Sequence, residues 1–268
     1  MVQPVRLSRE IRFGLHDSTI VTKSHNSFAG NPPLFGIAPF LTLMATVEGR
    51  PDANTGMLIN IKQVDEQLRQ IVINRLQKLY RDTGHTGWLF SGVETIQLLQ
   101  AAARNLFSPL KLQRLRLSLS PYLYYEYQQE EVPLIILAQR FEFSAAHRLH
   151  SSSMSEQENL RTFGKCNNPN GHGHNYELEV AIERKAGAPS EEGLTLAELQ
   201  EVVNQEVISR FDHKNLNLDC EEFASLNPTV ENIAQTIFDR LQLALVSRAE
   251  LQSVKVWETP KTCCEVCR

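Results

Sequence analysis

The sequence predicts an α+β protein made of two tandem units, each with two strands, two helices and two further strands. Short similar segments recur about 137 residues apart along the 268-residue chain. VETI at 93–96 and VENI at 230–233 would each open a helix, and LQRLRL at 112–117 has the pattern of LQSVKV at 251–256. A constant spacing of this kind indicates an internal repeat.

In the first unit, the segment after Gly56 leads into a predicted helix. Its apolar residues recur at the spacing of a helix face: Ile61, Val64, Leu68 and Ile71. A second helix would begin at 93–96, and a strand is expected at 112–117. A polar segment before Pro133 separates the units, so we predict domains over residues 1–131 and 132–268.

The second unit is predicted to begin with a strand that ends at His147, since Phe141, Phe143 and Ala145 alternate with less apolar residues. Asn-Pro-Asn-Gly at 168–171 is a turn sequence. One helix is expected to bury an apolar face, which consists of Leu199, Val202, Val203 and Val207.

A later helix is predicted to have Asn227 as its N-cap and Pro228 at its first helical position. Its apolar face would consist of Val230, Ile233, Ala234, Ile237 and Leu241. A strand follows at 254–257 and leads to Glu258.

Three histidines form a candidate metal site. His172 and His174 are two residues apart, so on an extended segment their side chains leave the same face. Catalytic zinc usually has three protein ligands and one open position, and His147 at a strand end is the best third candidate. A lone histidine is more often a core or surface residue. The clustering with nearby Cys166 is what favours a zinc (Zn2+) site with a base beside it.

Five motifs occur in the order typical of one enzyme family. They are FSAAHRL (143–149), FGKC to Tyr176 (163–176), DHKNLN (212–217), PTVENIA (228–234) and VKVWET (254–259). Over residues 136–262 the sequence resembles 6-pyruvoyl-tetrahydropterin synthase and its relative 6-carboxytetrahydropterin synthase. The resemblance implies the tunnelling fold (T-fold), in which each unit is an antiparallel four-stranded sheet with two helices on one face.

The resemblance also implies roles for individual residues. His147, His172 and His174 correspond to the zinc ligands, and Cys166 to the general base. Asp212 and His213 correspond to a proton-relaying pair. Glu258 corresponds to the pterin anchor, with Glu231 and Thr229 lining the same pocket. Each assignment has a purely structural alternative. Cys166 could be an ordinary buried cysteine, and Asp212 and His213 could be ordinary loop residues. Glu231 could serve only to interact with the helix dipole.

Two features depart from the family pattern. The connection before Leu196 is shorter than usual, and the tail carries Cys263, Cys264 and Cys267 where an ordinary closing strand is expected. No family role matches these three cysteines.

The two units differ in their chemistry. If Phe40 corresponds to Tyr176, then Gly36 and Ala38 stand where the second unit has His172 and His174, and Leu119 stands in place of Glu258. The first unit retains His16, His25 and His85, but not at a chelating spacing. We expect it to be a degenerate copy without a metal site.

Composition limits the remaining function classes. The net charge of −4 gives no basic footprint for nucleic acid, and no apolar run reaches the roughly 20 residues that span a bilayer. Five cysteines, an odd number, make a poor disulfide framework, so a reducing, cytoplasmic setting is expected. Closure of a T-fold barrel needs more than two units, which predicts a homo-oligomer: a trimer of tandem chains, or a dimer.

The sequence thus predicts a zinc-dependent lyase that converts 7,8-dihydroneopterin triphosphate to 6-pyruvoyl-tetrahydropterin and eliminates triphosphate. The first alternative is 6-carboxytetrahydropterin synthase of the queuosine (deazapurine) pathway, which uses the same substrate. The five-residue spacer between Cys166 and His172 resembles the pyruvoyl enzyme. The second alternative is a non-catalytic zinc- or pterin-binding protein, which the presence of Cys166, Asp212 and His213 disfavours.

Overall fold

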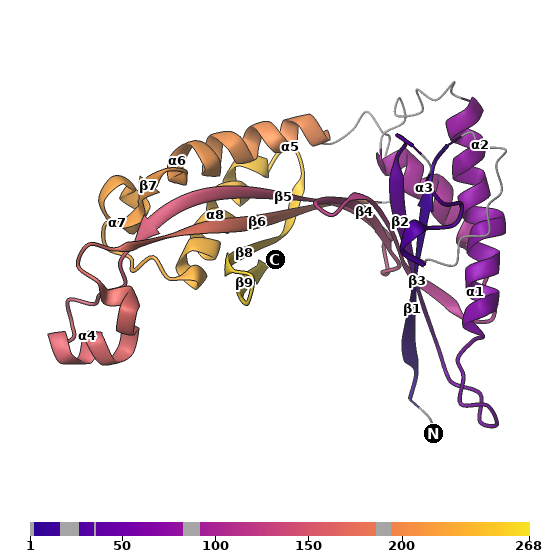
Figure 1. Ribbon diagram of the computed structural model, residues 1–268, viewed down its shortest axis with the longest axis horizontal. Coiled ribbons are helices and arrows are strands. Elements are labelled where there is room, and N and C mark those ends of the chain that lie inside the picture. The colour runs from indigo at the N-terminus through magenta and orange to yellow at the C-terminus, as the bar shows by residue number, and fades with distance from the viewer. Residues whose placement is uncertain (1–2, 17–26, 35, 83–91, 186–193) are drawn as a thin grey trace. The chain divides into compact units, whose positions relative to one another are not determined.

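The computed structural model describes residues 3–16, 27–34, 36–82, 92–185 and 194–268 (Figure 1). Contacts divide the chain into two compact units. The first comprises Met1–Leu137 with Arg184–Glu192, and the second comprises Ala138–Glu183 with Gly193–Arg268. Each unit combines strands and helices, as predicted. The boundary at 131/132 stays a prediction, and His25, His85 and residues 186–193 of the connection before Leu196 lie outside the described residues.

The first unit contains a sheet with the strand order β1-β2-β3-β4, whose neighbours pair antiparallel. The strands are β1 (Val5–Gly14), β2 (Phe40–Gly49), β3 (Lys111–Ser120) and β4 (Leu123–Gln128). The helices are η1 (Ser27–Ala29), α1 (Ile61–Gln67), η2 (Leu68–Ile73), α2 (Asn74–Asp82) and α3 (Gly92–Ala103). In Figure 1 the longer helices cover one face of these strands.

Two of the four residues predicted for the buried face of the first helix are exposed. Val64 and Leu68 are buried as expected, but Ile61, the first residue of α1, is 47% exposed. Ile71 is 43% exposed, and Val72 is buried in its place. The cause at Ile71 is η2, a π-helical turn between α1 and α2. A π turn holds more residues than an α turn, so it moves the buried face by one position.

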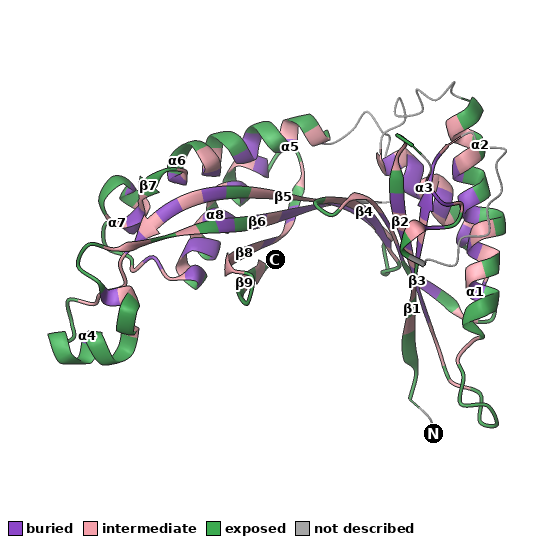
Figure 2. Cartoon of the chain, in the orientation of Figure 1, coloured by how far each residue is buried: buried purple, intermediate pink, exposed green. Residues whose placement is uncertain are grey.

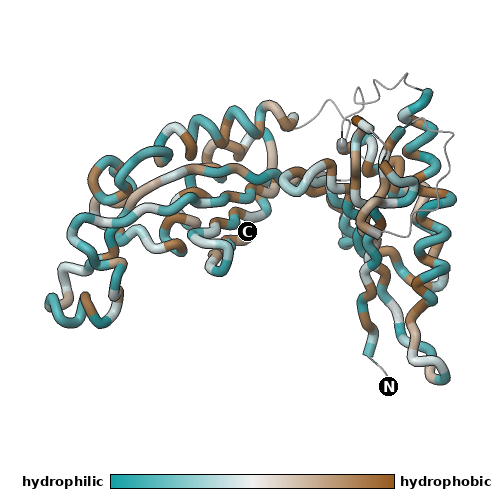
Figure 3. The backbone as a smooth tube through the Cα atoms, in the orientation of Figure 1, coloured by the Kyte–Doolittle hydropathy of each residue, from teal (hydrophilic) through white to brown (hydrophobic). Residues whose placement is uncertain are grey.

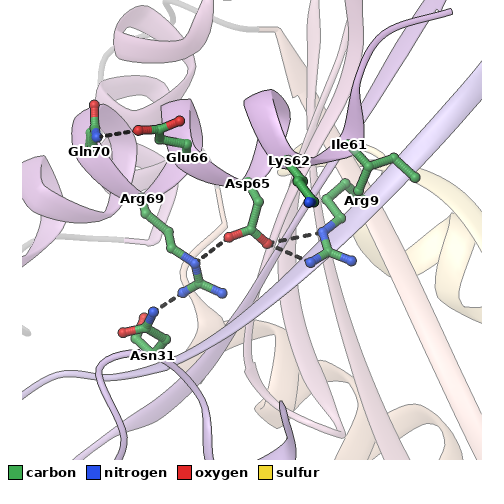
Figure 4. A pocket seen from close by; sticks show the side chains of 8 residues that line it. All are labelled: Arg9, Asn31, Ile61, Lys62, Asp65, Glu66, Arg69 and Gln70. Atoms are coloured by element: carbon green, nitrogen blue, oxygen red, sulfur yellow. Dashed lines mark hydrogen bonds and ion pairs between the residues drawn. The ribbon is translucent and has the colours of Figure 1, made fainter. Parts of the chain in front are cut away.

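A polar cluster ties α1 to β1 in the first unit (Figure 4). Arg9 donates from Nη2 to Asp65 Oδ1 at 2.5 Å, and Arg69 donates from Nε to Oδ2 at 2.6 Å. Arg69 also donates to the carbonyl of Asn31. Burial alone would raise the pKa of Asp65, but the two guanidinium groups outweigh it and the pKa lies below its usual value. Asp65 is thus a structural link between a helix, a strand and a loop.

The second unit contains a sheet with the strand order β5-β6-β8-β9, and β7 lies parallel beside β5. The strands are β5 (Leu134–His147), β6 (His172–Lys185), β7 (Lys214–Asn215), β8 (Glu250–Thr259) and β9 (Thr262–Cys267). The helices are α4 (Glu156–Phe163), η4 (Gly164–Asn167), α5 (Leu196–Val203), η5 (Asn204–Ile208), α6 (Ser209–Phe211), α7 (Leu216–Asp219), η6 (Glu221–Phe223) and α8 (Val230–Leu245). The cysteine-containing tail therefore does form a strand, and all three of its thiols are free.

The apolar face predicted for α8 is confirmed. All five of its members are buried: Val230, Ile233, Ala234, Ile237 and Leu241. The predicted start of the helix is wrong by two residues, because Thr229 rather than Asn227 is the N-cap. The Thr229 hydroxyl accepts a hydrogen bond from the Asn232 amide at 3.3 Å.

In both units the buried residues lie between the strands and the helices. Figure 2 shows buried residues along the strands and on the sides of the helices that face them. In Figure 3, hydrophilic and hydrophobic segments alternate along α5, as expected for a helix with one buried side. None of the described helices has the length and apolar character needed to cross a bilayer.

The two units share irregularities as well as element order. Both β3 and β8 have ten residues, and both β4 and β9 have six. The pairing shifts between Ser118 and Ser120 in one hairpin and between Trp257 and Thr259 in the other. A π-helical turn follows an α-helix in each unit, η2 after α1 and η5 after α5.

These registers correct one predicted correspondence. Thr42 pairs with Ser118, and Glu177 pairs with Trp257, so Leu41 rather than Phe40 corresponds to Tyr176. Ile37 and Pro39 therefore stand in place of the paired histidines. The predicted match of Leu119 with Glu258 agrees with the registers, since each lies at the pairing shift.

Candidate active site

His147, the last residue of β5, is fully buried. Its Nδ1 lies 2.7 Å from the carbonyl oxygen of Pro228, which can only accept. Nδ1 therefore carries the proton, and Nε2 has its lone pair free. Ligating histidines are typically oriented in this way by a hydrogen bond from the other ring nitrogen.

His172 and His174 open β6, and the chain reaches them through Gly171. Gly171 has a φ of 70°, and a Cβ built there would lie 3.0 Å from the carbonyl oxygen of His147. Only glycine combines this backbone conformation with such close approach to another chain segment. The turn thereby brings the histidine pair against the end of β5.

The three imidazoles converge on one point. One ring nitrogen from each lies within 4.8 Å of the others, and Nε2 of His147 lies 3.2 Å from Nε2 of His172. Nitrogens bound to one tetrahedral zinc ion at about 2.0–2.1 Å would be roughly 3.3 Å apart. His174 Nε2 and His172 Nδ1 are buried and lack hydrogen-bond partners. Burial lowers the pKa of both His147 and His172, which favours the neutral, ligating form. The cluster could hold a metal ion.

The Glu258 carboxylate lies beside the histidine cluster. Its Oε1 is 3.4 Å from Nε2 of His147 and 3.7 Å from Nε2 of His174. The residue occupies the pairing shift between Trp257 and Thr259 on the β8–β9 hairpin. Such bulges redirect a side chain out of the regular alternation of a strand. Glu258 is therefore positioned to contact whatever binds at the histidines.

Cys166 lies in η4 and is half-buried. Its carbonyl accepts a hydrogen bond from the amide of Leu149 at 2.8 Å, which holds η4 close to the end of β5. Burial raises the pKa of the Cys166 thiol, and the charge of Glu258 raises it further. The protein groups alone therefore do not produce the lowered pKa that a thiolate base requires. A cation bound nearby would act in the opposite direction.

Asp212 and His213 form a hydrogen-bonded pair. Asp212 accepts from the Ser144 amide at 2.8 Å, and its other oxygen lies 2.8 Å from His213 Nδ1. The amide of Ser144 and then His213 lower the pKa of Asp212, so the carboxylate is ionised near neutral pH. His213 has a φ of 57°, rare for a residue with a side chain, and its side chain is 82% exposed. Among the described residues, no hydrogen bond or ion pair joins this pair to Cys166.

Two hollows border the histidine cluster. The first has a volume of about 790 Å³, and His172, Arg148 and Lys165 are among its lining residues. The second has a volume of about 510 Å³, and His174, His213 and Lys214 are among its lining residues. Both volumes are within the range of small-ligand sites, roughly 300–1,000 Å³.

Thr229 and Glu231 stand at the start of α8. The Thr229 hydroxyl serves as the helix N-cap, and Glu231 is exposed in the first turn. Neither residue lines the two hollows beside the histidines. Their contribution to substrate binding stays a prediction.

Three asparagines hold the segment after His147, a role that no sequence pattern predicted. The amide of Arg148 donates to Asn217 Oδ1 at 2.7 Å, and the Asn217 side chain donates back to the Arg148 carbonyl at 3.0 Å. Asn227 accepts from the amide of His150, and Asn167 accepts from the side chain of Arg148. Asn167 and Asn217 fall within the quoted motifs, and Asn227 was expected to cap the following helix instead.

Comparison with known proteins identifies the second unit. The family model for 6-pyruvoyl tetrahydropterin synthase matches residues 136–268. The chain is 44% identical over 129 residues to 6-pyruvoyl tetrahydrobiopterin synthase of Drosophila melanogaster, with 48% of this chain and 77% of that protein covered. The chain belongs to the 6-pyruvoyl tetrahydropterin synthase family.

The chain is also similar to a second curated relative and to two solved structures. The Homo sapiens 6-pyruvoyl tetrahydrobiopterin synthase is 43% identical over 46% of this chain and 84% of its own length. The structure of the Caenorhabditis elegans family member is 38% identical, with a TM-score of 0.47 over 51% of this chain and 97% of that one. A hyper-thermostable uricase mutant matches in fold alone, at 8% identity and a TM-score of 0.51, over 100% of this chain and 93% of that one.

Proposed function

We propose that this protein is a zinc-dependent lyase that converts 7,8-dihydroneopterin triphosphate to 6-pyruvoyl-tetrahydropterin and triphosphate. The convergence of His147, His172 and His174 within a region 44% identical to a named 6-pyruvoyl tetrahydrobiopterin synthase carries this proposal. The reaction needs no external oxidant, because the pterin ring gains the two electrons that the side chain loses.

Zinc is the metal that the donor set favours. Three neutral imidazoles with one open position are a common catalytic arrangement for this ion. When bound there, zinc would supply Lewis-acid polarisation of the substrate's side-chain oxygens. The buried Nε2 of His174 has no hydrogen-bond partner among the described residues, and this supports the presence of a ligand at this point.

The remaining residues have distinct tasks in the proposal. Cys166 removes a proton from a side-chain carbon of the substrate. The Asp212 carboxylate holds His213 in the tautomer protonated on Nδ1, which leaves His213 Nε2 available to exchange protons. Glu258 accepts hydrogen bonds from the amino-pyrimidine edge of the pterin, which offers adjacent N–H donors to a carboxylate.

The first unit is proposed to be a degenerate duplicate with an architectural role. Its shared pairing shifts and π turn support a common origin with the second unit. It has no histidine pair at the corresponding positions. Both β1 and β9 end a row of paired strands, and open edges favour association with further strands. We infer a homo-oligomer, either three chains forming two stacked barrels or two chains closing one.

Other activities on related substrates remain outcomes of the test. The chain is 27% identical to 6-carboxy-5,6,7,8-tetrahydropterin synthase of Haemophilus influenzae and 31% identical to a dihydroneopterin monophosphate aldolase of Pyrococcus furiosus. Both values are lower than those for the pyruvoyl enzymes of animals.

Mass analysis of the products from dihydroneopterin triphosphate tests the proposal. The zinc-loaded protein should yield 6-pyruvoyl-tetrahydropterin and inorganic triphosphate in equal amounts. A 6-carboxy product, or a 6-hydroxymethyl product of aldol cleavage, would replace the proposal with one of the related activities. No product at all, with pterin still bound, would favour the non-catalytic alternative.

A further inference from the structure

The first hollow combines positive charge with direct access to the histidine cluster. Its lining includes Arg148, Glu156, Gln157, Lys165, Asn167 and His172. His172 belongs to the candidate metal site, so a ligand in this hollow adjoins the reacting atoms. Lys165 directly precedes Cys166, which places a cation next to the proposed base.

The Arg148 guanidinium is held in a fixed orientation. Its Nη2 donates to Asn167 Oδ1 at 3.1 Å, and its Nε donates to the Asn167 carbonyl at 3.3 Å. Asn167 is itself buried. These bonds occupy two of the three guanidinium nitrogens, and Nη1 has no partner among the described residues. The arrangement presents a preorganised donor to the hollow.

Lys165 is the second cation of the hollow. It is exposed, and among the residues that the structure describes its ammonium group has no hydrogen-bond or ion-pair partner. Among the described residues that line the hollow, Glu156 is the one carboxylate, and it too is exposed. The remaining lining residues, including the neutral His172 imidazole, carry no charge. The hollow therefore has a net positive lining, although the whole chain has a net charge of −4.

We propose that this hollow binds the triphosphate group of the substrate through Lys165 and Arg148. This inference rests on the proposed function and adds the location of the leaving group. In the elimination, the C–O bond to triphosphate breaks and its electron pair leaves on the triphosphate oxygen. A guanidinium and an ammonium at that position bind the anion and stabilise the charge that develops on it.

The second hollow is less suited to an anion. It contains Lys214, but His213 beside it is hydrogen-bonded to the ionised Asp212. The net charge near that hollow is therefore lower. Lys214 thus provides a matched control, as a lysine that also adjoins the histidine cluster but from the other hollow.

Binding of two unreactive ligands isolates the triphosphate contribution. Neopterin triphosphate and neopterin are fully oxidised pterins that differ only in the phosphates, and their fluorescence allows dissociation constants to be measured on the full-length, zinc-loaded protein. The dissociation constant of neopterin divided by that of neopterin triphosphate reports the contribution of the triphosphate alone. Lys165→Gln should reduce this ratio about tenfold, the usual scale for one charged hydrogen bond. Arg148→Lys, which retains the charge but loses the planar fork, should reduce it less than Arg148→Gln.

Two further variants give opposite or null results. Glu156→Gln removes the only carboxylate from the lining and should raise the ratio, whereas Lys214→Gln should leave it unchanged. Each variant is first checked for a native circular dichroism spectrum and melting temperature.

Three results would overturn the inference. In the first, Lys165→Gln and Arg148→Gln weaken the binding of both ligands equally. In the second, Lys214→Gln reduces the ratio of dissociation constants to about one. In the third, the wild-type protein binds the two ligands with the same affinity. In each of these cases pterin still binds and the proposed function stands. If the wild type binds neither ligand, the proposed function fails together with the inference.

Discussion

Replacement of Gly171 by alanine tests whether the close approach of the turn to β5 assembles the metal site. A Cβ at this position meets the His147 carbonyl oxygen at 3.0 Å, in a backbone conformation with φ of 70°. The left-handed conformation alone costs about 1–2 kcal/mol for a residue with a side chain. The contact adds to this cost, because the neighbouring atom belongs to the backbone and cannot swing away. Either the variant is destabilised by about 2 kcal/mol or more, or the turn withdraws from β5.

Withdrawal of the turn would carry His172 and His174 away from His147. Disruption of the shell that orients metal ligands typically weakens metal binding by 10- to 100-fold. We expect a loss of this size for Gly171→Ala in zinc competition with a chromogenic chelator, together with a lower melting temperature.

Gly173→Ala is the matched control for this experiment. Gly173 lies between the same two histidines, but its Cβ would meet its nearest neighbour at an ordinary 3.6 Å and its φ is not left-handed. This variant should be neutral or slightly stabilising. Equal zinc affinity and equal melting temperature for the two variants would refute the role assigned to the Gly171 turn.

Four further predictions follow from the site and the units. His174→Ala should lose the metal and the activity, and the wild type should contain about one zinc per chain; a ratio near two would mean that the first unit also holds metal. Cys166→Ala should retain zinc and pterin but lose turnover by roughly 10²-fold; near-normal turnover would remove the cysteine from the mechanism. Asp65→Asn should lower stability by about 1 kcal/mol through the lost guanidinium contacts. Because the pKa of Asp65 is lowered in the folded state, its contribution is present above its unfolded pKa of about 3.9 and is lost as the pH falls through the folded value, so wild type and variant should converge in acid unfolding. Removal of residues 1–131 should cause aggregation or loss of activity; a soluble, fully active remainder would show that the first unit is dispensable.

The sequence predicted those features that depend on local pattern. Alternation placed His147 at a strand end, and the two-residue spacing put His172 and His174 on one side of the next strand. Helical periodicity identified the buried face of α8 correctly. These patterns are local because each reflects which side of one element faces the core.

The features that the sequence did not predict depend on partners distant in the sequence or on irregular backbone. The π turn that buries Val72 instead of Ile71 leaves no sequence signature. The side chain of Asn227 accepts a hydrogen bond from the amide of His150, 77 residues earlier, and Thr229 caps α8 instead. The pairing shift that directs Glu258 toward the histidines emerges only when β8 pairs with β9. Asn217 acts on a segment 69 residues earlier in the chain, a separation beyond any local pattern.

The hydrogen bond from His147 to Pro228 would link occupancy of the candidate metal site to the folding of α8. The carbonyl that orients the ligand directly precedes Thr229, the residue that caps the helix. An ion that binds only the assembled histidines therefore stabilises the whole ligand-bearing unit, by about 2.7 kcal/mol at a free concentration of one hundred times its dissociation constant. The described residues of the first unit contain no such ligand set, so they would gain nothing directly. If zinc binds as proposed, the two halves of one chain would respond differently to the zinc concentration of their surroundings, and metal scarcity would act first on the half with the histidine cluster.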